Sequence, residues 1–428
     1  MRLAHMLCVL APILPRHVVA ETIDGKVTPR VMIISMWTPE SHVWHRRFHE
    51  SRLGNLSSLA VPLPGLSMLF PHVFCTEDGR VCQATVGEGE INSAVSMTAL
   101  VLAKAFDLRR TYFLIAGIAG VNPRLATIGS VALARFAVQV ALQYEIDARS
   151  LPPDWPTGYI PYGRRHPLEY PCITYGTEVF EVSQRLRDIS FELASRAVLS
   201  DEEGPRNYRA RYAGIQDQFA MATRPPSVVK CDSATSDVYY SGTKLAQAFE
   251  NTTRVWTNGT GVHCMSAQED TATLEVLVRA AVEGLADFSR VILMRSGTCR
   301  CRRRPLPSPS CSRDHKGSNF DRPPPDMSDL QHLTGVDQNG MSIAVDNLFN
   351  AGIEIVKSIV GAWNCTFGRG VPPTNYIGDI FGSLGGHPDF GLGSITNGKV
   401  IAPAGKGGNL ARLEMARRAK FASQMTMP

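Results

Sequence analysis

Three segments of this sequence place acidic, amide and aromatic side chains directly beside short apolar runs. They are CDSATSDVYYSG (231–242), CMSAQEDTATLE (264–275), and the pair MRSG and SNFDRP (294–323) with its unusual intervening stretch. Because ligands of open α/β folds bind at the carboxyl ends of strands, these side chains are candidates for one site. Carboxylates and amides suit hydroxyl groups and ring nitrogens, and Tyr239 or Tyr240 suits stacking on a flat ring. Ordinary loop polarity explains the same pattern, and the pattern alone does not decide.

A glycine-rich turn gives a weaker chemical signal. GEGEIN (87–92) resembles a phosphate-binding loop, but it lacks both GK[ST] and GxGxxG. A tight strand-to-helix turn is the favoured interpretation, with Asn92 as a candidate helix N-cap.

Two patterns resemble metal sites without completing one. His42, His45 and His49 are spaced three and four apart, as zinc ligands on a helix face would be, but no HExxH motif is present. A solvated helix face is favoured there. The CxC at 299–301 fits no standard ligand spacing. We therefore predict no metal and no cofactor.

The apolar periodicity predicts the elements that position these groups. Buried strands are expected in the apolar runs, and helices where apolar residues recur at helical spacing. Because strands alternate with helices, we predict an α/β fold, a three-layer α/β/α sandwich with a mixed central sheet. The segment 151–226 is predicted to be an insertion with its own helix (182–200), and 391–428 a loosely ordered tail. The predicted strands lie in 31–36, 111–120, 129–147, 227–231 and 291–294, and the clearest helices are 271–288 and 341–362.

The composition bounds the class of protein. At 428 residues, 44% hydrophobic and 19% charged, the chain has globular values. The net charge of +5 resides in 298–317, where five Arg and one Lys face one Asp (5 + 1 − 1 = 5). The remaining chain is close to neutral, which argues against a nucleic-acid partner.

Several features predict export. Residues 1–20 resemble a signal peptide, with Arg2, a short apolar run and a small-residue cleavage pattern. We find no other apolar run long enough to span a bilayer. Four Asn-x-Ser/Thr sequons are consistent with a secreted, cell-envelope or vacuolar glycoprotein; they begin at Asn55, Asn251, Asn258 and Asn364.

The cysteines favour the same compartment. Cys75 and Cys82 flank TEDGRV, which contains an Asp-Gly turn step, so a hairpin disulfide is predicted. Cys231 with Cys264 is a second predicted pair. Buried free thiols are the alternative, and the remaining connectivity is open.

Eight blocks in order resemble one fungal family, the purine nucleoside permeases. The resemblance covers 28–390 and implies a nucleoside phosphorylase/nucleosidase-like fold that binds purine nucleosides. A homo-oligomer is one possible assembly of such a chain. The blocks are VMIISMWTPE, VCQATVGEGEIN, YFLIAGIAGVNP, GYIPYG, YGTEVFEV, CDSATSDVYYSG, AQEDTATLE and TNYIGDIFGSLGG.

The resemblance implies roles for the sugar side of the site. Glu40, shortly after the first strand, would position a water molecule. Gln268 and Glu269 would hold the ribose hydroxyls. The backbone of Ile118, Ala119 and Gly120 would approach the sugar and base.

It also implies roles for the base side. Tyr239, near Asp237, would stack on the base. Asn319 stands where the family fold usually has an aspartate that protonates purine N7, and an amide cannot donate a full proton. The resulting alternatives are slow catalysis, an altered specificity, or rescue of this function by Asp321.

The resemblance further marks Thr298–Gly317 as additional sequence. A strand-to-motif junction close to RSGSNFDRP would be continuous without it. We predict a retained intron or gene-model artefact, and a genuine exposed loop is the alternative.

The resulting functional prediction is hydrolysis of the N-glycosidic bond of a purine nucleoside. The carboxylates Glu88 and Glu90 would repel phosphate, which disfavours phosphorolysis. The alternatives are a non-catalytic nucleoside-binding component of nucleoside transport, a phosphorylase, and a defective gene product.

Overall fold

The structure is a computed structural model that describes residues 22–23, 25–214, 218–297, 320–388 and 390. Several predictions lie outside the described residues. They concern the signal segment (1–20), Thr298–Gly317, Asn319 and the tail (391–428).

One bent strand, β7 (Tyr112–Val121), organises the central sheet. Its first part pairs in parallel with β3 (Val31–Ser35) and β16 (Val291–Gly297), while its last residues pair antiparallel with β15 (His263–Ala267). The sheet is therefore mixed, as predicted. The other strands of this sheet are β4 (Leu59–Pro62), β5 (His72–Cys75), β6 (Val81–Thr85), β8 (Val131–Ala134), β9 (Phe136–Gln139), β12 (Val179–Glu181), β13 (Val228–Lys230), β14 (Asp232–Thr235) and β17 (Gly378–Asp379). Two separate antiparallel pairs are β1 (Thr22–Ile23) with β2 (Lys26–Val27), and β10 (Tyr144–Glu145) with β11 (Tyr159–Ile160).

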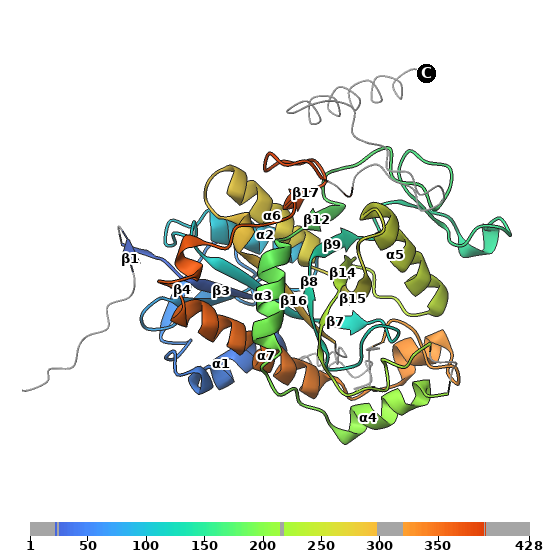
Figure 1. Ribbon diagram of the computed structural model, residues 1–428, viewed down its shortest axis with the longest axis horizontal. Coiled ribbons are helices and arrows are strands. Elements are labelled where there is room, and N and C mark those ends of the chain that lie inside the picture. The colour runs from blue at the N-terminus through green and yellow to red at the C-terminus, as the bar shows by residue number, and fades with distance from the viewer. Residues whose placement is uncertain (1–21, 24, 215–217, 298–319, 389, 391–428) are drawn as a thin grey trace, which may run out of the picture.

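Helices cover both faces of this sheet, which confirms the three-layer prediction (Figure 1). Side chains alternate along β3, so that Met32 and Ile34 pack under α2 and α6, while Val31 and Ile33 pack under α1 and α7. A strand buried on both faces needs an uninterrupted apolar sequence, which explains the run VMIIS. The helices are α1 (Thr38–Arg47), α2 (Glu90–Val101), α3 (Gln184–Ala194), α4 (Glu203–Arg209), α5 (Thr243–Trp256), α6 (Asp270–Val282) and α7 (Met341–Gly361).

The ends predicted for two helices were wrong. The helix predicted over 182–200 is α3, which ends at Ala194. The periodicity predicted a helix over 271–288, but α6 ends at Val282. Gly284 has φ 69°, the left-handed region that glycine adopts readily at helix ends. Phe288 follows this turn and is still buried in the core.

The segment 151–226 contributes to the main layers. Strand β12 pairs with β9 in the large sheet, and α3 packs against α7. These two elements therefore help to build the core, whereas β11 pairs only with β10.

Both predicted disulfides are present. Cys75–Cys82 joins the neighbouring strands β5 and β6, with Cα atoms 4.0 Å apart. Cys231–Cys264 ties the start of β14 to β15, with Cα atoms 5.8 Å apart. Within the described residues, no helix combines the length and apolar character needed to cross a bilayer.

The packing of α7 generates a stability prediction. A Cβ atom on Gly352 would lie 2.7 Å from Cη2 of Trp44 and 2.8 Å from Cε of Met294. We expect Gly352→Ala to lower the free energy of unfolding by about 1–3 kcal/mol through overpacking. Gly361→Ala in the same helix meets no atom within 4 Å and should raise it by about 0.5–1 kcal/mol. Urea unfolding with the disulfides intact measures both, and equal changes would contradict the packing explanation.

Candidate functional site

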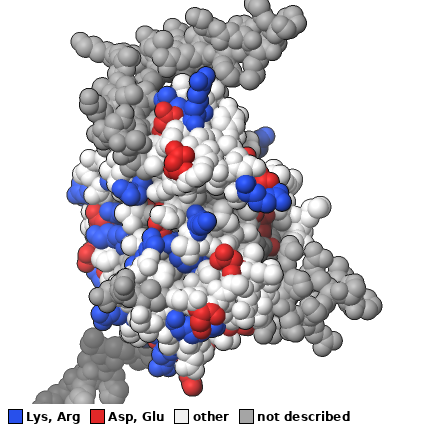
Figure 2. Space-filling model, turned by 90° about the vertical axis from the view of Figure 1, so that its right-hand side faces the viewer, with Lys and Arg blue, Asp and Glu red and all other residues white. Residues whose placement is uncertain are grey.

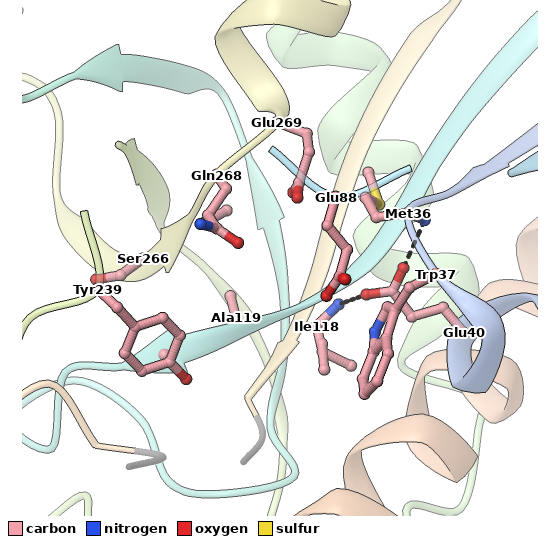
Figure 3. Close-up of a pocket in the computed structure, with 12 residues that line it drawn as sticks. Met36, Trp37, Glu40, Glu88, Ile118, Ala119, Tyr239, Ser266, Gln268 and Glu269 are labelled. Carbon is pink, nitrogen blue, oxygen red and sulfur yellow. Dashed lines mark hydrogen bonds between the residues drawn. The ribbon is translucent and has the colours of Figure 1, made fainter. Parts of the chain in front are cut away.

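A cleft opens at the carboxyl ends of β3 and β7 (Figure 3). It spans about 430 Å³, including the open space at its mouth, and its walls come from β7, from the end of β15 and from the segments after β3, β6, β14 and β15. The parallel pairing of β3 and β7 brings these segments together at one edge of the sheet. The lining residues are Met36, Trp37, Glu40, Glu88, Ile118, Ala119, Gly120, Tyr239, Ser266, Ala267, Gln268 and Glu269.

Glu40 forms one end of this cleft. It lies in the first turn of α1, is 1% exposed, and accepts hydrogen bonds from the backbone N–H groups of Met36 (2.6 Å) and Ile118 (2.8 Å). Burial raises the pKa of Glu40 to about 7, opposed by the positive charge of Arg295. A carboxylate with such a pKa can accept a proton at neutral pH.

Arg295 is a buried cation behind the cleft wall, close to Glu40. Its Nε donates to Oδ1 of Asp270 (2.9 Å), its Nη2 to Oε2 of Glu269 (3.2 Å), and its Nη1 to the carbonyl of Ile118 (3.1 Å). Burial alone would lower the pKa of Arg295, but the carboxylates of Asp270 and Glu269 raise it. Arg295 therefore carries a permanent positive charge that fixes Glu269 at the cleft wall.

Glu269 links this ion pair to the glycine-rich turn. Its Oε1 accepts from the backbone N–H of Gly89 (2.9 Å), and burial raises its pKa. Asp237 accepts in the same way from the N–H of Glu90 (3.0 Å). Two carboxylates thus occupy amide groups at the start of α2 that a phosphate-binding loop would offer to its ligand. Helix α2 begins after Gly89 rather than at Asn92, which donates from its side chain to the carbonyl of Glu88 (2.7 Å).

A second cleft adjoins the first and shares Gly120, Tyr239 and Gln268 with it. Asp321 lines this second cleft and is paired with the neighbouring Arg322 through two hydrogen bonds, of 2.6 and 2.9 Å. Arg322 also pairs with Glu250. The carboxylate of Asp321 is therefore held in the second cleft as a hydrogen-bond acceptor.

Tyr240, also in the second cleft, is held between polar and apolar contacts. Its hydroxyl lies 2.6 Å from Oγ of Ser266, and its ring packs edge-on against Phe249. Tyr239 is 44% exposed and lines both clefts, which leaves it the better placed of the two rings to stack on a ligand.

The structure brings most of the predicted site residues together. Seven line the first cleft and Asp321 lines the second, whereas Asp237 lines neither and binds the start of α2. The seven are Glu40, Ile118, Ala119, Gly120, Tyr239, Gln268 and Glu269. The sequence analysis did not identify Arg295 as a site residue. A signal was available, because a charged residue directly follows the apolar run VILM.

The described residues contain no group of three or more His, Cys, Asp or Glu side chains arranged to hold a metal ion. His45 instead contacts Ser57 (2.9 Å) and Gln83 (3.1 Å) through its ring nitrogens. On the face seen in Figure 2, Lys and Arg side chains are interspersed with Asp, Glu and uncharged surface.

A family model for purine nucleoside permeases matches residues 28–305 and 314–372 of this chain. The chain belongs to the purine nucleoside permease family. The match is interrupted at 306–313 but includes the other residues of Thr298–Gly317, so the prediction that this segment is additional sequence stays a prediction. A purine nucleoside permease of Candida albicans (strain SC5314) is 42% identical over 386 residues, which cover 88% of this chain and 87% of that protein.

Solved structures were also compared with this permease-family chain. A 5′-methylthioadenosine/S-adenosylhomocysteine nucleosidase from Neisseria meningitidis is 13% identical, with a TM-score of 0.41, over 78% of this chain and 99% of that chain. A futalosine hydrolase mutant of Helicobacter pylori is 14% identical, with a TM-score of 0.39, over 78% and 99%.

The buried ion pairs of this permease-family protein generate a second stability prediction. Arg295→Met should lower the free energy of unfolding by about 3–5 kcal/mol, because Glu269 and Asp270 remain buried without their cation. Arg279→Met removes a pair with Glu275 whose arginine is 76% exposed, so its cost should stay within about 1 kcal/mol. Urea unfolding of both variants measures the difference. A loss in Arg295→Met as small as in Arg279→Met would refute the assigned importance of the buried pair.

Proposed function

We propose that this permease-family protein binds a purine nucleoside in the two joined clefts and hydrolyses its N-glycosidic bond. The observation that carries the proposal is the position of Glu40. A fully buried carboxylate with a pKa of about 7 stands at one end of a cleft, with Glu269 and Arg295 beside it. Perturbed carboxylates in clefts are frequent at catalytic sites, because proton transfer needs a pKa near the working pH.

The nucleoside would lie across both clefts. Its base stacks on Tyr239 and faces Asp321 in the second cleft, and its ribose hydroxyls donate to Glu269 in the first. Both oxygens of Glu269 already accept one hydrogen bond each. Each oxygen has a further lone pair, which allows a second bond from a sugar hydroxyl.

Glu40 would then activate water. It accepts a proton from a water molecule whose oxygen attacks C1′ of the ribose, while the bond from C1′ to the base nitrogen breaks. The bonding electron pair leaves with the base, which takes up a proton from bulk water, and Glu40 later returns its own proton to solvent, so the products are free base and ribose. The carboxylates of Glu40 and Glu269 would stabilise the positive charge that develops on the sugar ring.

Hydrolysis is favoured over phosphorolysis by the charges of the site. The N–H groups of Gly89 and Glu90 are occupied by the carboxylates of Glu269 and Asp237. A phosphate entering this region would meet negative charge and find these amides already bonded.

A non-catalytic role in nucleoside uptake is the second candidate function. It follows from the name that the family carries, and from Asn319, which cannot protonate a leaving purine. Under this hypothesis the protein captures the nucleoside without cleaving it. The two disulfides are consistent with the proposal that the protein works in a secreted, envelope or vacuolar location.

The experiment that tests these functions is a chromatographic assay for free base. Adenosine or inosine is added in phosphate-free buffer to the chain with and without Thr298–Gly317. Release of base without phosphate supports the hydrolase. Comparing the rate of base release by the two chains shows whether Thr298–Gly317 affects activity. Base released only with added phosphate would indicate a phosphorylase. Binding without cleavage under all conditions would indicate the uptake component.

Replacing Glu40 should separate binding from catalysis. We expect Glu40→Gln to slow base release roughly a hundredfold to ten-thousandfold, because the amide cannot accept the proton. Nucleoside affinity, measured by calorimetry, should change little, since the side-chain volume is kept. The matched control is Glu50→Gln on the nearby surface, and retained turnover in Glu40→Gln would rule out Glu40 as the base.

The rate should also depend on pH with a predictable sign. Glu40 accepts a proton only when ionised, so kcat/KM should fall as the pH drops below about 7. The pKa of Glu90 is also raised to about 7. The variant Glu90→Gln therefore shows which of the two glutamates causes the fall in kcat/KM. The acidic limb should persist in this variant, and its disappearance would transfer the role to Glu90.

A further inference from the structure

A separate cleft lies at the opposite, amino-terminal edge of the sheet. It spans about 800 Å³, including the open space at its mouth, between the segment entering β3, the segment entering β7 and the segment after α7. The five residues of β3 separate it from the nucleoside cleft, a distance of roughly 16 Å at about 3.3 Å per residue. The lining residues are Thr28, Pro29, Arg30, Asp107, Arg109, Arg110 and Trp363.

The cleft is positively charged. Three guanidinium groups and one carboxylate line it, which leaves a net charge of two (3 − 1 = 2). The nucleoside cleft has the opposite character, since Glu40, Glu88 and Glu269 line it. A concave site lined by one sign of charge concentrates ligands of the other sign.

Two of the arginines are fixed around one indole ring. Cζ of Arg30 lies 5.3 Å from the ring centroid of Trp363, and Cζ of Arg110 lies 5.7 Å from it. Arg30 also donates to the carbonyl of Val360 (3.3 Å), and Arg110 to the carbonyl of Gly368 (2.7 Å). Their guanidinium groups are therefore positioned before any ligand arrives.

The third arginine is the most accessible of the set. The side chain of Arg109 is 66% exposed, and its Nε donates to Oδ1 of Asp107 (2.9 Å). The contact of Arg30 with the carbonyl of Val360 lies in the last turn of α7, where the negative end of the helix dipole favours a cation. Gly368 and Asp107 place Arg110 and Arg109 in turn, and the three guanidinium groups line one common cleft.

We propose that this cleft binds a phosphate group. A guanidinium offers parallel N–H donors that match phosphate oxygens, and three such groups at one concave surface suit a multiply charged anion. The phosphate belongs either to a soluble compound or to the headgroup of an anionic lipid. Nucleoside binding and cleavage need neither, so this site stands independently of the proposed function.

The test measures binding of two phosphate probes to the full chain. Inorganic pyrophosphate is titrated by calorimetry, and phosphatidylcholine vesicles with and without phosphatidic acid are tested by sedimentation. We expect Arg109→Gln to weaken binding of whichever probe binds by roughly tenfold, because one hydrogen bond to a charged group is lost. Added salt should weaken the same interaction.

The chain offers a closely matched control. Arg149 makes the same contacts with Asp147 that Arg109 makes with Asp107, but it lines none of the described clefts and its side chain is 88% exposed. Arg149→Gln should therefore bind as the unmodified chain does. Asp107→Asn removes the one carboxylate of the cleft and should tighten binding, whereas Asp147→Asn should not.

The outcomes separate the two sources and the null result. Pyrophosphate binding that is lost in Arg109→Gln supports a soluble phosphate ligand. Vesicle binding that requires phosphatidic acid and is lost in the same variant supports a lipid headgroup. No binding of either probe, or equal losses in Arg109→Gln and Arg149→Gln, would overturn the proposal.

Discussion

The buried guanidinium of Arg295 is the constraint on which the site depends. It reaches the centre of the molecule from β16 and satisfies its donors with Asp270, Glu269 and the carbonyl of Ile118. A charge buried this deeply is tolerated only when its partners are fixed in place. Gly117 makes room for it, since a Cβ atom there would lie 2.2 Å from Nη1 of Arg295. The packing of the site therefore requires glycine at position 117, the first glycine of the β7 sequence YFLIAGIAG.

The balance of charge around Arg295 also sets the chemistry of Glu40. One cation is shared among the carboxylates of Asp270, Glu269 and Glu40, so its positive charge offsets only part of the effect of burial on the pKa of Glu40. Burial then dominates, and the pKa of Glu40 rises to about 7. The same ion pair that holds Glu269 in position therefore leaves Glu40 able to exchange a proton near neutral pH.

The direction of the chain segregates charge between the two edges of the sheet. Helices α1, α2 and α6 follow β3, β6 and β15, so their amino-terminal ends meet at the first cleft, which Glu40 and Glu269 line. Carboxylates occupy these positive helix ends. The carboxyl-terminal end of α7 approaches the opposite edge, where arginines bind nearby carbonyls. The acidic and basic clefts are thus two consequences of one topology.

Much of the fold could be predicted because strands buried on both faces require uninterrupted apolar runs, and β3, β7 and β16 all have them. Local sequence does not distinguish Glu40 from Glu50, because burial is decided by α7 and the sheet. The family resemblance supplied the positions of Glu40 and Glu269. Arg295 was missed because an arginine after VILM signals the end of a strand, whereas β16 continues to Gly297. Its compensating carboxylates come from 25 and 26 residues earlier in the chain.

The energetics of Glu40 bear on the choice between cleavage and capture. A protein that only binds a neutral nucleoside needs hydrogen bonds and apolar contacts that match the ground state. It gains nothing from a fully buried carboxylate whose ionised form is disfavoured. A hydrolase does gain, because a carboxylate with a pKa near neutral pH can accept the proton of the attacking water. That interaction lowers the energy of the transition state and not that of the bound substrate. The burial of Glu40 therefore favours cleavage, even though the family is named for transport.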